Sequence, residues 1–375
     1  MIARSFYMIV LFLILNATCQ DKNTTNKFDI RDEHHKVAKY IAILLFTILL
    51  LYSIISNILM AIALFCGGKD NSYSRAFVLI ALQLIISNLI YLLPQMFVIL
   101  PELLQTPSNP YSNFNKFAYV LVNQTTWMNY RFSRLFASSY ISILQFSFLL
   151  TLNRFVAIIL PEYNAFFKSA RLYFLIILVW LSVLAFSIID YYYCTRRFLI
   201  WNLTWEMKCG GPKGGNIFWS IRFAWTLFIP NIMFVMYVTI FYNICRKQRF
   251  SADINQNQRN RKMCANRNAV IHYEWPILIQ AAWNCGVLEI QTLSFNFLSS
   301  FLVKIFDEGI YIPSRIFINS YVILVCAVLP TVHFIYSKKA LNILKHYLYF
   351  WFHRRTAHIK NDITTISVKI NAGQL

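Results

Sequence analysis

Two charged residues near the inner ends of apolar segments could form an ionic switch. Arg154 lies in the tetrad Leu152-Asn153-Arg154-Phe155, and Glu274 stands at the start of a later apolar segment. Arginine is costly in hydrocarbon, so an arginine at the end of a membrane span is a functional candidate. A partly exposed pair between Arg154 and Glu274 would contribute about 1 kcal/mol, enough to shift a two-state equilibrium several-fold. The alternative is that Arg154 extends to the lipid headgroups while Glu274 stabilises the start of its own helix.

A third charged residue, Glu289, lies within the same apolar segment as Glu274. It follows Glu274 by 15 residues, and at about 1.5 Å per residue it lies roughly 22 Å deeper in a helix. A carboxyl at that depth is expected to be protonated, held by amides such as Asn88 and Asn319, or used by a ligand. The competing interpretation is a protonated side chain that donates one hydrogen bond to a neighbouring helix.

Aromatic and amide side chains within the apolar segments are candidates for a ligand pocket. They are Tyr140, Gln145, Asn284, Asn296, Asn319 and Tyr321. For any single amide, a hydrogen bond between helices is the favoured alternative, because membrane amides often serve that way. Arg222, like Arg131, Arg134 and Arg315, lies near the outer end of a span. There an arginine either extends to the headgroups or favours an acidic ligand.

Seven apolar segments must position these residues. The chain has 375 residues, of which 58% are hydrophobic and 13% charged, which is not the composition of a soluble protein. A membrane helix needs about 20 apolar residues. The segments that meet this length are Tyr40–Phe65, Ala76–Leu100, Leu135–Leu160, Leu172–Tyr192, Ile217–Ile244, Ile277–Val303 and Ile310–Tyr336. The outer end of the third segment is left open, because the aromatic and basic residues from Trp127 onward could extend it outward.

The sequence divides into four parts. Residues 1–19 are typical of a secretory signal peptide, with Arg4 before a short apolar stretch and Ala17-Thr18-Cys19 as a cleavage site; an uncleaved anchor is the alternative. We expect an extracellular segment at 20–39, a seven-helix transmembrane domain at 40–336, and a cytoplasmic amphipathic helix with a tail at 337–375. The sequons at Asn23 and Asn202 then lie outside the cell, where glycosylation occurs.

Charge and cysteine placement agree with this topology. The formal net charge is +20, and it gathers in the loop after the fifth segment and in the tail, which is typical of cytoplasmic loops and not of nucleic-acid binding. We interpret these basic segments as a topology signal and not as a specific lipid or partner site. Membrane lipids are expected as partners of the spans and of the amphipathic helix. Cys194 and Cys209 flank Asn202 in one outer loop, and because that compartment is oxidising we expect them to form a disulfide.

These features together resemble the nematode serpentine chemoreceptors, and among them class X. The resemblance runs from about Tyr40 to Leu344 and rests on matching positions in most segments. These are Ser56-Asn57, Ser87-Asn88-Leu89, Leu152-Asn153-Arg154-Phe155, Pro161, Trp180, the Cys194…Cys209 pair, Pro230 and Glu274…Gln280. The resemblance implies an all-α membrane protein, a seven-helix bundle of rhodopsin-like G-protein-coupled receptor architecture. It also implies a small-molecule ligand, a heterotrimeric G protein as partner, and the plasma membrane of a sensory cilium.

Three departures from the wider receptor pattern bear on mechanism. No cysteine occurs between Cys66 and Cys194, so the usual disulfide from the third span to the outer loop cannot form. Asn88 replaces an aspartate, which removes a carboxylate that would hold sodium. The seventh span has Pro330 and His333 in Leu329-Pro330-Thr331-Val332-His333, where an Asn-Pro-x-x-Tyr motif is usual. We expect Asn153, Arg154, Phe155, Glu274, Pro330 and His333 to serve activation and G-protein coupling.

Other functions remain as alternatives. A peptide receptor would also suit a glycosylated outer loop, and a seven-span ligand-gated channel of the insect odorant-receptor type would place the N-terminus inside. An enzyme is the weakest interpretation, because the spans contain no His/Asp/Glu cluster with metal-ligand spacing. No cofactor and no metal are therefore expected.

Overall fold

A computed structural model describes most of the membrane-embedded part of the chain. The described residues are 30, 35–69, 74–104, 116–167, 170–209, 214–257, 279, 282–306, 308–337, 340–346 and 349. The predicted signal peptide, Asn23, Glu274 and the tail beyond 349 lie outside these residues.

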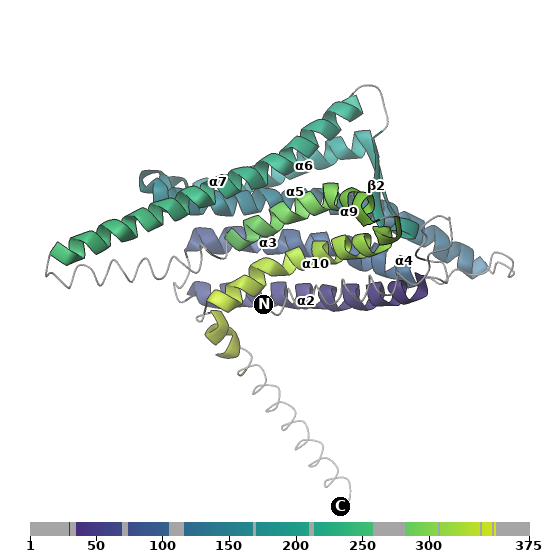
Figure 1. Ribbon diagram of the computed structural model, residues 1–375, viewed down its shortest axis with the longest axis horizontal. Coiled ribbons are helices and arrows are strands. Elements are labelled where there is room, and N and C mark those ends of the chain that lie inside the picture. The colour runs from purple at the N-terminus through teal and green to yellow at the C-terminus, as the bar shows by residue number, and fades with distance from the viewer. Residues whose placement is uncertain are drawn as a thin grey trace, which may run out of the picture.

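Long helices packed lengthwise form the body of the protein (Figure 1). Six of them are long and apolar enough to cross a membrane, among the described residues: Lys36–Cys66, Arg75–Leu104, Trp127–Ile159, Ala170–Tyr193, Ser220–Arg246 and Tyr311–Tyr336. They belong to α2 (Lys36–Lys69), α3 with α4 (Arg75–Pro94, Leu100–Leu104), α5 (Lys116–Ile159), α6 (Ala170–Tyr193), α7 (Gly214–Asn257) and α10 (Tyr311–Tyr336). The third helix extends outward beyond Leu135 and past Trp127, since α5 begins at Lys116.

The remaining predicted segment, Ile277–Val303, is helical wherever it is described from residue 282 onward. Residues 282–293 form a helix that continues through a π-helical turn, Ser294–Leu298, into α9, Ser299–Phe306. The bundle thus contains a helical segment at each of the seven predicted places. A second π-helical turn, Gln95–Ile99, follows Pro94 between α3 and α4, where the proline removes one helical N–H.

Burial identifies the central helices. In α5 and α10, 72% of the most apolar stretch is buried within the protein, whereas in α6 the share is 17%. Residues of α5 therefore face other helices on most sides, and α6 presents most of its surface outward. Because the sequence places Arg154 and Tyr140 on α5, the central helix carries both an inner and an outer candidate residue.

The outer loop after α6 is a β-hairpin, which the all-α prediction did not include. Strand β1 (Cys194–Leu199) pairs antiparallel with β2 (Thr204–Cys209), and Cys194 lies opposite Cys209 in the register. The predicted disulfide between them is confirmed. The hairpin crosses one end of the bundle (Figure 1). Following the predicted topology, we call residues 194–209 the outer hairpin, and we call the opposite end of the bundle its inner end.

The turn of the outer hairpin is buried against the bundle. Leu203 has a φ of 52° and is 1% exposed, and its carbonyl accepts a hydrogen bond from Asn319 Nδ2 of α10 at 2.9 Å. A left-handed residue other than glycine is held only where its surroundings determine it. The turn is therefore fixed to α10 and is not a freely hanging loop.

A short helix at residues 340–346 follows α10, as expected for the cytoplasmic amphipathic helix. Leu344 is buried and Leu341 is 37% exposed. The neighbouring positions needed to judge the whole predicted apolar stripe lie outside the described residues.

Candidate functional site

Asn129 of α5 attaches the outer hairpin to the bundle. Its Oδ1 accepts from the backbone N–H of Phe198 at 2.9 Å, and its Nδ2 donates to the Phe198 carbonyl at 3.0 Å. The same Nδ2 donates to Glu102 Oε1 of α4 at 2.6 Å. A side-chain amide that pairs with both backbone groups of one residue imitates a strand neighbour. It links the third span to the outer loop, the connection for which the sequence lacks a cysteine.

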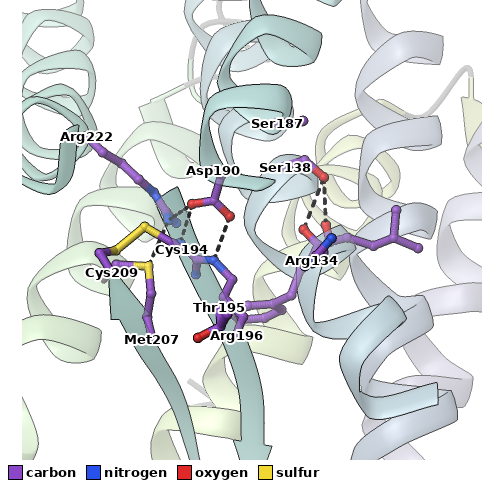
Figure 2. Close-up of polar contacts among 12 residues, drawn as sticks. Arg134, Ser138, Ser187, Asp190, Cys194, Thr195, Arg196, Met207, Cys209 and Arg222 are labelled. Atoms are coloured by element: carbon purple, nitrogen blue, oxygen red, sulfur yellow. Dashed lines mark hydrogen bonds and ion pairs between the residues drawn. A yellow bond between two sulfur atoms is a disulfide. The ribbon is translucent and has the colours of Figure 1, made fainter. Parts of the chain in front are cut away.

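A buried ionic cluster lies beneath the base of the outer hairpin (Figure 2). Asp190, at the outer end of α6, accepts from Arg196 Nε at 2.9 Å and Nη2 at 3.0 Å, and from Arg222 Nη1 of α7 at 3.1 Å. The three side chains are only 9–12% exposed. Burial lowers the pKa of the Arg196 guanidinium, and the charge and hydrogen bonds of Asp190 act in the opposite direction. The cluster joins α6, β1 and α7 and carries one positive charge more than Asp190 balances.

The outer hairpin covers a central pocket of about 100 Å³. Its lining comes from α3, α5, the hairpin, α7 and residues 291–296: Tyr91, Phe136, Ala137, Tyr140, Arg196, Trp205, Met207, Arg222, Phe223, Thr226, Gln291, Thr292, Phe295 and Asn296. Phe136 stacks between Tyr91, at 4.8 Å between ring centroids, and Trp205, at 4.4 Å. Pockets lined by aromatic rings with a few polar groups are typical of small-molecule sites.

Hydrogen bonds fix the polar groups of this pocket. Tyr140 Oη and Thr292 Oγ1 lie 2.7 Å apart, and Gln291 Nε2 donates to Tyr91 Oη at 2.9 Å. Both contacts join the helix at residues 282–293 and α3 or α5. A ligand that contacts these groups would therefore also change the packing of that helix against its neighbours.

The predicted pocket residues divide into two groups. Tyr140 and Arg222 line the central pocket, as does Asn296. Asn319 does not: its amide is used by the carbonyls of Leu203 and Arg315, so it supports the hairpin turn. Asn284 donates to Ser147 Oγ of α5 at 3.0 Å. This amide therefore makes a hydrogen bond between two helices, as the alternative to a role in the pocket predicted.

Glu289 lies on the helix at residues 282–293 and contacts α7. Its Oε1 accepts a long hydrogen bond of 3.4 Å from Asn231 Nδ2, and its Oε2 is buried without a hydrogen-bond partner among the described residues. The suggested amide partners were wrong, because Asn88 is bonded to Asn57 and Cys326 and Asn319 to the hairpin turn. Glu289 is therefore a carboxyl outside the central pocket, at the contact between two helices.

A second cavity of about 190 Å³ lies beside the central pocket between α5, α6 and α7. It is lined by Arg134, Leu135, Ala137, Ser138, Ile141, Phe186, Ser187, Asp190, Tyr191, Phe218 and Arg222. Ala137 and Arg222 line both cavities. We call this second one the lateral cavity; the ionic cluster forms part of the wall between the two.

At the inner end of the bundle, Arg154 and His333 contact the same aromatic ring. The Arg154 guanidinium lies 4.9 Å from the centre of the Phe77 ring of α3, and the imidazole of His333 stacks on that ring at 6.2 Å. Phe77 thus connects α5 and α10 through α3. Asn153 is buried beside Arg154, and Phe155 packs against the core. Glu274 lies outside the described residues, so the switch between Arg154 and Glu274 stays a prediction.

Pro330 acts on the bundle through a carbonyl that it leaves without a helical partner. A proline has no N–H, so the carbonyl four residues earlier, that of Cys326, receives no helical hydrogen bond from it. Asn57 Nδ2 of α2 donates to this carbonyl at 2.8 Å, and Asn88 Nδ2 of α3 at 3.2 Å. Asn88 also donates to Asn57 Oδ1 at 3.3 Å. The two asparagines thereby join three helices at a bend-prone position of α10.

Of the two predicted glycosylation sites, only Asn202 is described. It lies in the hairpin turn, is 8% exposed, and accepts from the Thr204 N–H at 3.2 Å through Oδ1. Glycosylation at Asn202 and at Asn23 stays a prediction. Among the described residues there is no group of three or more His, Cys, Asp or Glu that could hold a metal ion.

A seven-helix bundle with a hairpin-covered outer pocket and an arginine at its inner end defines the class of G-protein-coupled receptors. The solved structure of squid rhodopsin has this fold: it matches with a TM-score of 0.63 over 84% of this chain and 86% of that chain, at 11% sequence identity. That likeness concerns the fold alone. The family described as serpentine type 7TM GPCR chemoreceptor Srx matches residues 54–273, more than half of the chain. The chain belongs to this family, as the resemblance predicted; no curated protein matches it.

Several residues that build these sites were not singled out from the sequence, among them Asn129, Trp205, Phe77 and Asp190. Asn129 and Trp205 give no signal in a sequence, because their partners are distant in the chain. Phe77 is one of 33 phenylalanines. Asp190 could have been found, since an acidic residue at the end of an apolar span marks a functional or paired position by default.

Proposed function

We propose that this receptor binds a small chemosensory molecule in the central pocket and activates a heterotrimeric G protein at its inner end. The observation that carries the proposal is the enclosure of an aromatic pocket by the outer hairpin, which several helices and the disulfide hold in place. Membership in a chemoreceptor family supports the ligand class. The arginine at the inner end of central helix α5 supports the coupling surface.

The proposed coupling links pocket and inner end through helix packing. A ligand touching Tyr140 or Thr292 would shift the helix at residues 282–293 relative to α5. Movement of that helix away from Arg154 would expose the guanidinium to the G protein. A ligand drives such a change only by the difference in its affinity for the two states.

The peptide-receptor alternative is less favoured by the pocket. The outer hairpin covers it, and its volume of about 100 Å³ suits a small molecule. We further propose that the N-terminus is extracellular and that the protein resides in the plasma membrane of sensory cilia, in keeping with the family. A channel of the insect odorant-receptor type would instead have its N-terminus inside, and a glycosidase-dependent size shift that disappears in Asn23→Gln separates the two.

The test is expression in a reporter cell, with chemical classes of small molecules screened for second-messenger responses. A response should disappear in Arg154→Ala at normal surface level, because the coupling surface is lost. It should shift to higher concentration in Tyr140→Phe, because the pocket hydroxyl is lost while the ring remains. Ser142→Ala is the matched control, since that hydroxyl donates to the Ser139 carbonyl of its own helix and is not among the described lining of either cavity. A response that survives Arg154→Ala unchanged would contradict G-protein coupling at this surface.

A further inference from the structure

Positive charge exceeds negative charge around the two outer cavities. Arg196 and Arg222 line the central pocket, and no acidic residue is among its described lining. Arg134, Arg222 and Asp190 line the lateral cavity. Three guanidinium groups therefore border the two cavities, whereas the one carboxylate, Asp190, borders only the lateral cavity. The other carboxylate of the hairpin, Glu206, does not change this balance of charge. It forms ion pairs with Arg197 and Lys208 on the hairpin surface.

The Asp190 carboxylate accepts three hydrogen bonds from the two arginines of the cluster. Arg196 approaches it with Nε and Nη2, so that pair is bidentate, and Arg222 adds only Nη1. The remaining contact of Arg222 is a weak one from the same Nη1 to the Met207 sulfur at 3.5 Å. Within the described part of the chain, Nε and Nη2 of Arg222 thus remain for a further acceptor. Figure 2 shows Arg222 entering the cluster from the side opposite Arg134.

A buried guanidinium next to apolar walls is costly unless an anion balances it. Asp190 balances Arg196 in close bidentate geometry, which leaves the charge of Arg222 beside the pocket. Guanidinium groups bind carboxylates and phosphates through paired N–H groups. The polar arrangement therefore favours an anion on the pocket side of Arg222.

We propose that the ligand of this receptor carries an anionic group, a carboxylate or a phosphate, on an apolar or aromatic body, and that Arg222 binds that group. The inference rests on the proposed function and deepens it by naming the chemical class of the ligand. The stacked rings of Tyr91, Phe136 and Trp205 accept the body. Asp190 is a positioning residue, because it orients both guanidiniums and is not among the described lining of the central pocket.

Two sources could supply the anionic group. A diffusible acid would enter beneath the outer hairpin. An anionic lipid of the surrounding bilayer would reach Arg222 through the lateral cavity, whose wall includes Tyr191, 56% exposed on the outward surface of α6. Both sources share the chemistry recognised by Arg222, and the experiment below distinguishes them.

The experiment measures binding to the full-length receptor in nanodiscs of phosphatidylcholine, by thermal unfolding and by titration. The probes are phenylacetic, 3-phenylpropanoic and octanoic acids, each with its neutral amide and the corresponding amine. Hydrogen bonds to a charged partner predict that the best acid binds about 10- to 100-fold more tightly than its amide. Arg222→Gln should reduce this ratio to within about threefold. That variant leaves Asp190 paired with Arg196, so no uncompensated carboxylate is buried.

Three further variants test whether the preference for acids depends on the guanidinium of Arg222. Arg197→Gln removes a neighbouring positive charge on the exposed face of β1 and should keep the acid-to-amide ratio of the wild type. Arg222→Lys keeps the charge without the planar fork and should fall between wild type and Arg222→Gln. Asp190→Asn removes the internal counter-ion, so acids should raise its unfolding temperature more than they raise that of the wild type.

The outcomes separate the inference from the proposed function. Equal binding of acids and amides, stronger binding of amines, or no binding of any acid would overturn the inference. Activation of GTP exchange by a neutral probe would also overturn the inference, but it would support the proposed receptor function. Acid binding without GTP exchange on any G protein would leave the inference standing and contradict the proposed function. Phosphatidylglycerol in the nanodisc should compete with the acids through Arg222 if the anion is a lipid, and should have no effect if it is a diffusible acid.

Discussion

Replacement of Asn129 by alanine should loosen the outer hairpin without unfolding the bundle. The substitution removes two hydrogen bonds to the backbone of Phe198, at 2.9 and 3.0 Å. Each is worth about 1 kcal/mol net. Their loss amounts to about 2 kcal/mol, which corresponds to roughly a 30-fold shift toward an open hairpin. The disulfide and the contact between Asn319 and Leu203 remain, so the strands should stay paired.

The assay is amide hydrogen exchange of the receptor in nanodiscs, followed in peptides that cover residues 194–209. Exchange in the hairpin should become about 30-fold faster in Asn129→Ala, and ligand dissociation should accelerate in parallel, because the cover of the pocket opens more often. Exchange within α2 and α10 should stay at the wild-type rate. Ser142→Ala on the same helix is the control, since its hydroxyl donates to the Ser139 carbonyl within α5 and it is not among the described lining of either cavity. Hairpin exchange within threefold of the wild type would refute the attachment by Asn129.

Four further outcomes are expected. Mass spectrometry of non-reduced peptides should find Cys194 joined to Cys209, and Cys194→Ser with Cys209→Ser should destabilise the hairpin by about 3 kcal/mol, as expected for a closed loop of this length; free thiols at both positions in surface-delivered receptor would contradict this. Glu289→Gln should keep surface expression and change basal activity or ligand response, because the carboxyl contacts Asn231 between two helices; an unchanged dose–response curve would favour a plain structural hydrogen bond. Glu274→Ala should raise ligand-independent signalling several-fold if it pairs with Arg154, whereas basal activity at the wild-type level would favour helix capping. Glycosidase treatment should reduce the apparent mass of the wild type more than that of Asn23→Gln, and an equal reduction would place the glycan elsewhere.

The sequence by itself determined the membrane spans and their order. Hydropathy is a local property that adds up residue by residue, and a helix is the structure that satisfies its own backbone in lipid. The predicted spans from Tyr40 to Tyr336 therefore agree with the helices in order and at most of their described ends. The exceptions are α5, which begins at Lys116 and not at Leu135, and α7, which continues to Asn257 beyond Ile244, because polar residues there prolong a helix that hydropathy alone does not detect. The disulfide could be predicted as well, because Cys194 and Cys209 are the two cysteines flanking one outer loop.

Only the tertiary structure decided how the side chains meet. Asn129 and Phe198 are 69 residues apart, and Arg222 lies 32 residues from Asp190; no local pattern pairs them. Which face of a helix meets its neighbour depends on rotation and tilt, and these follow from packing against several helices at once. The same reason explains why Asn319 supports the hairpin turn and does not line the pocket. Hydropathy places a residue at a depth in the membrane, whereas packing selects its partner.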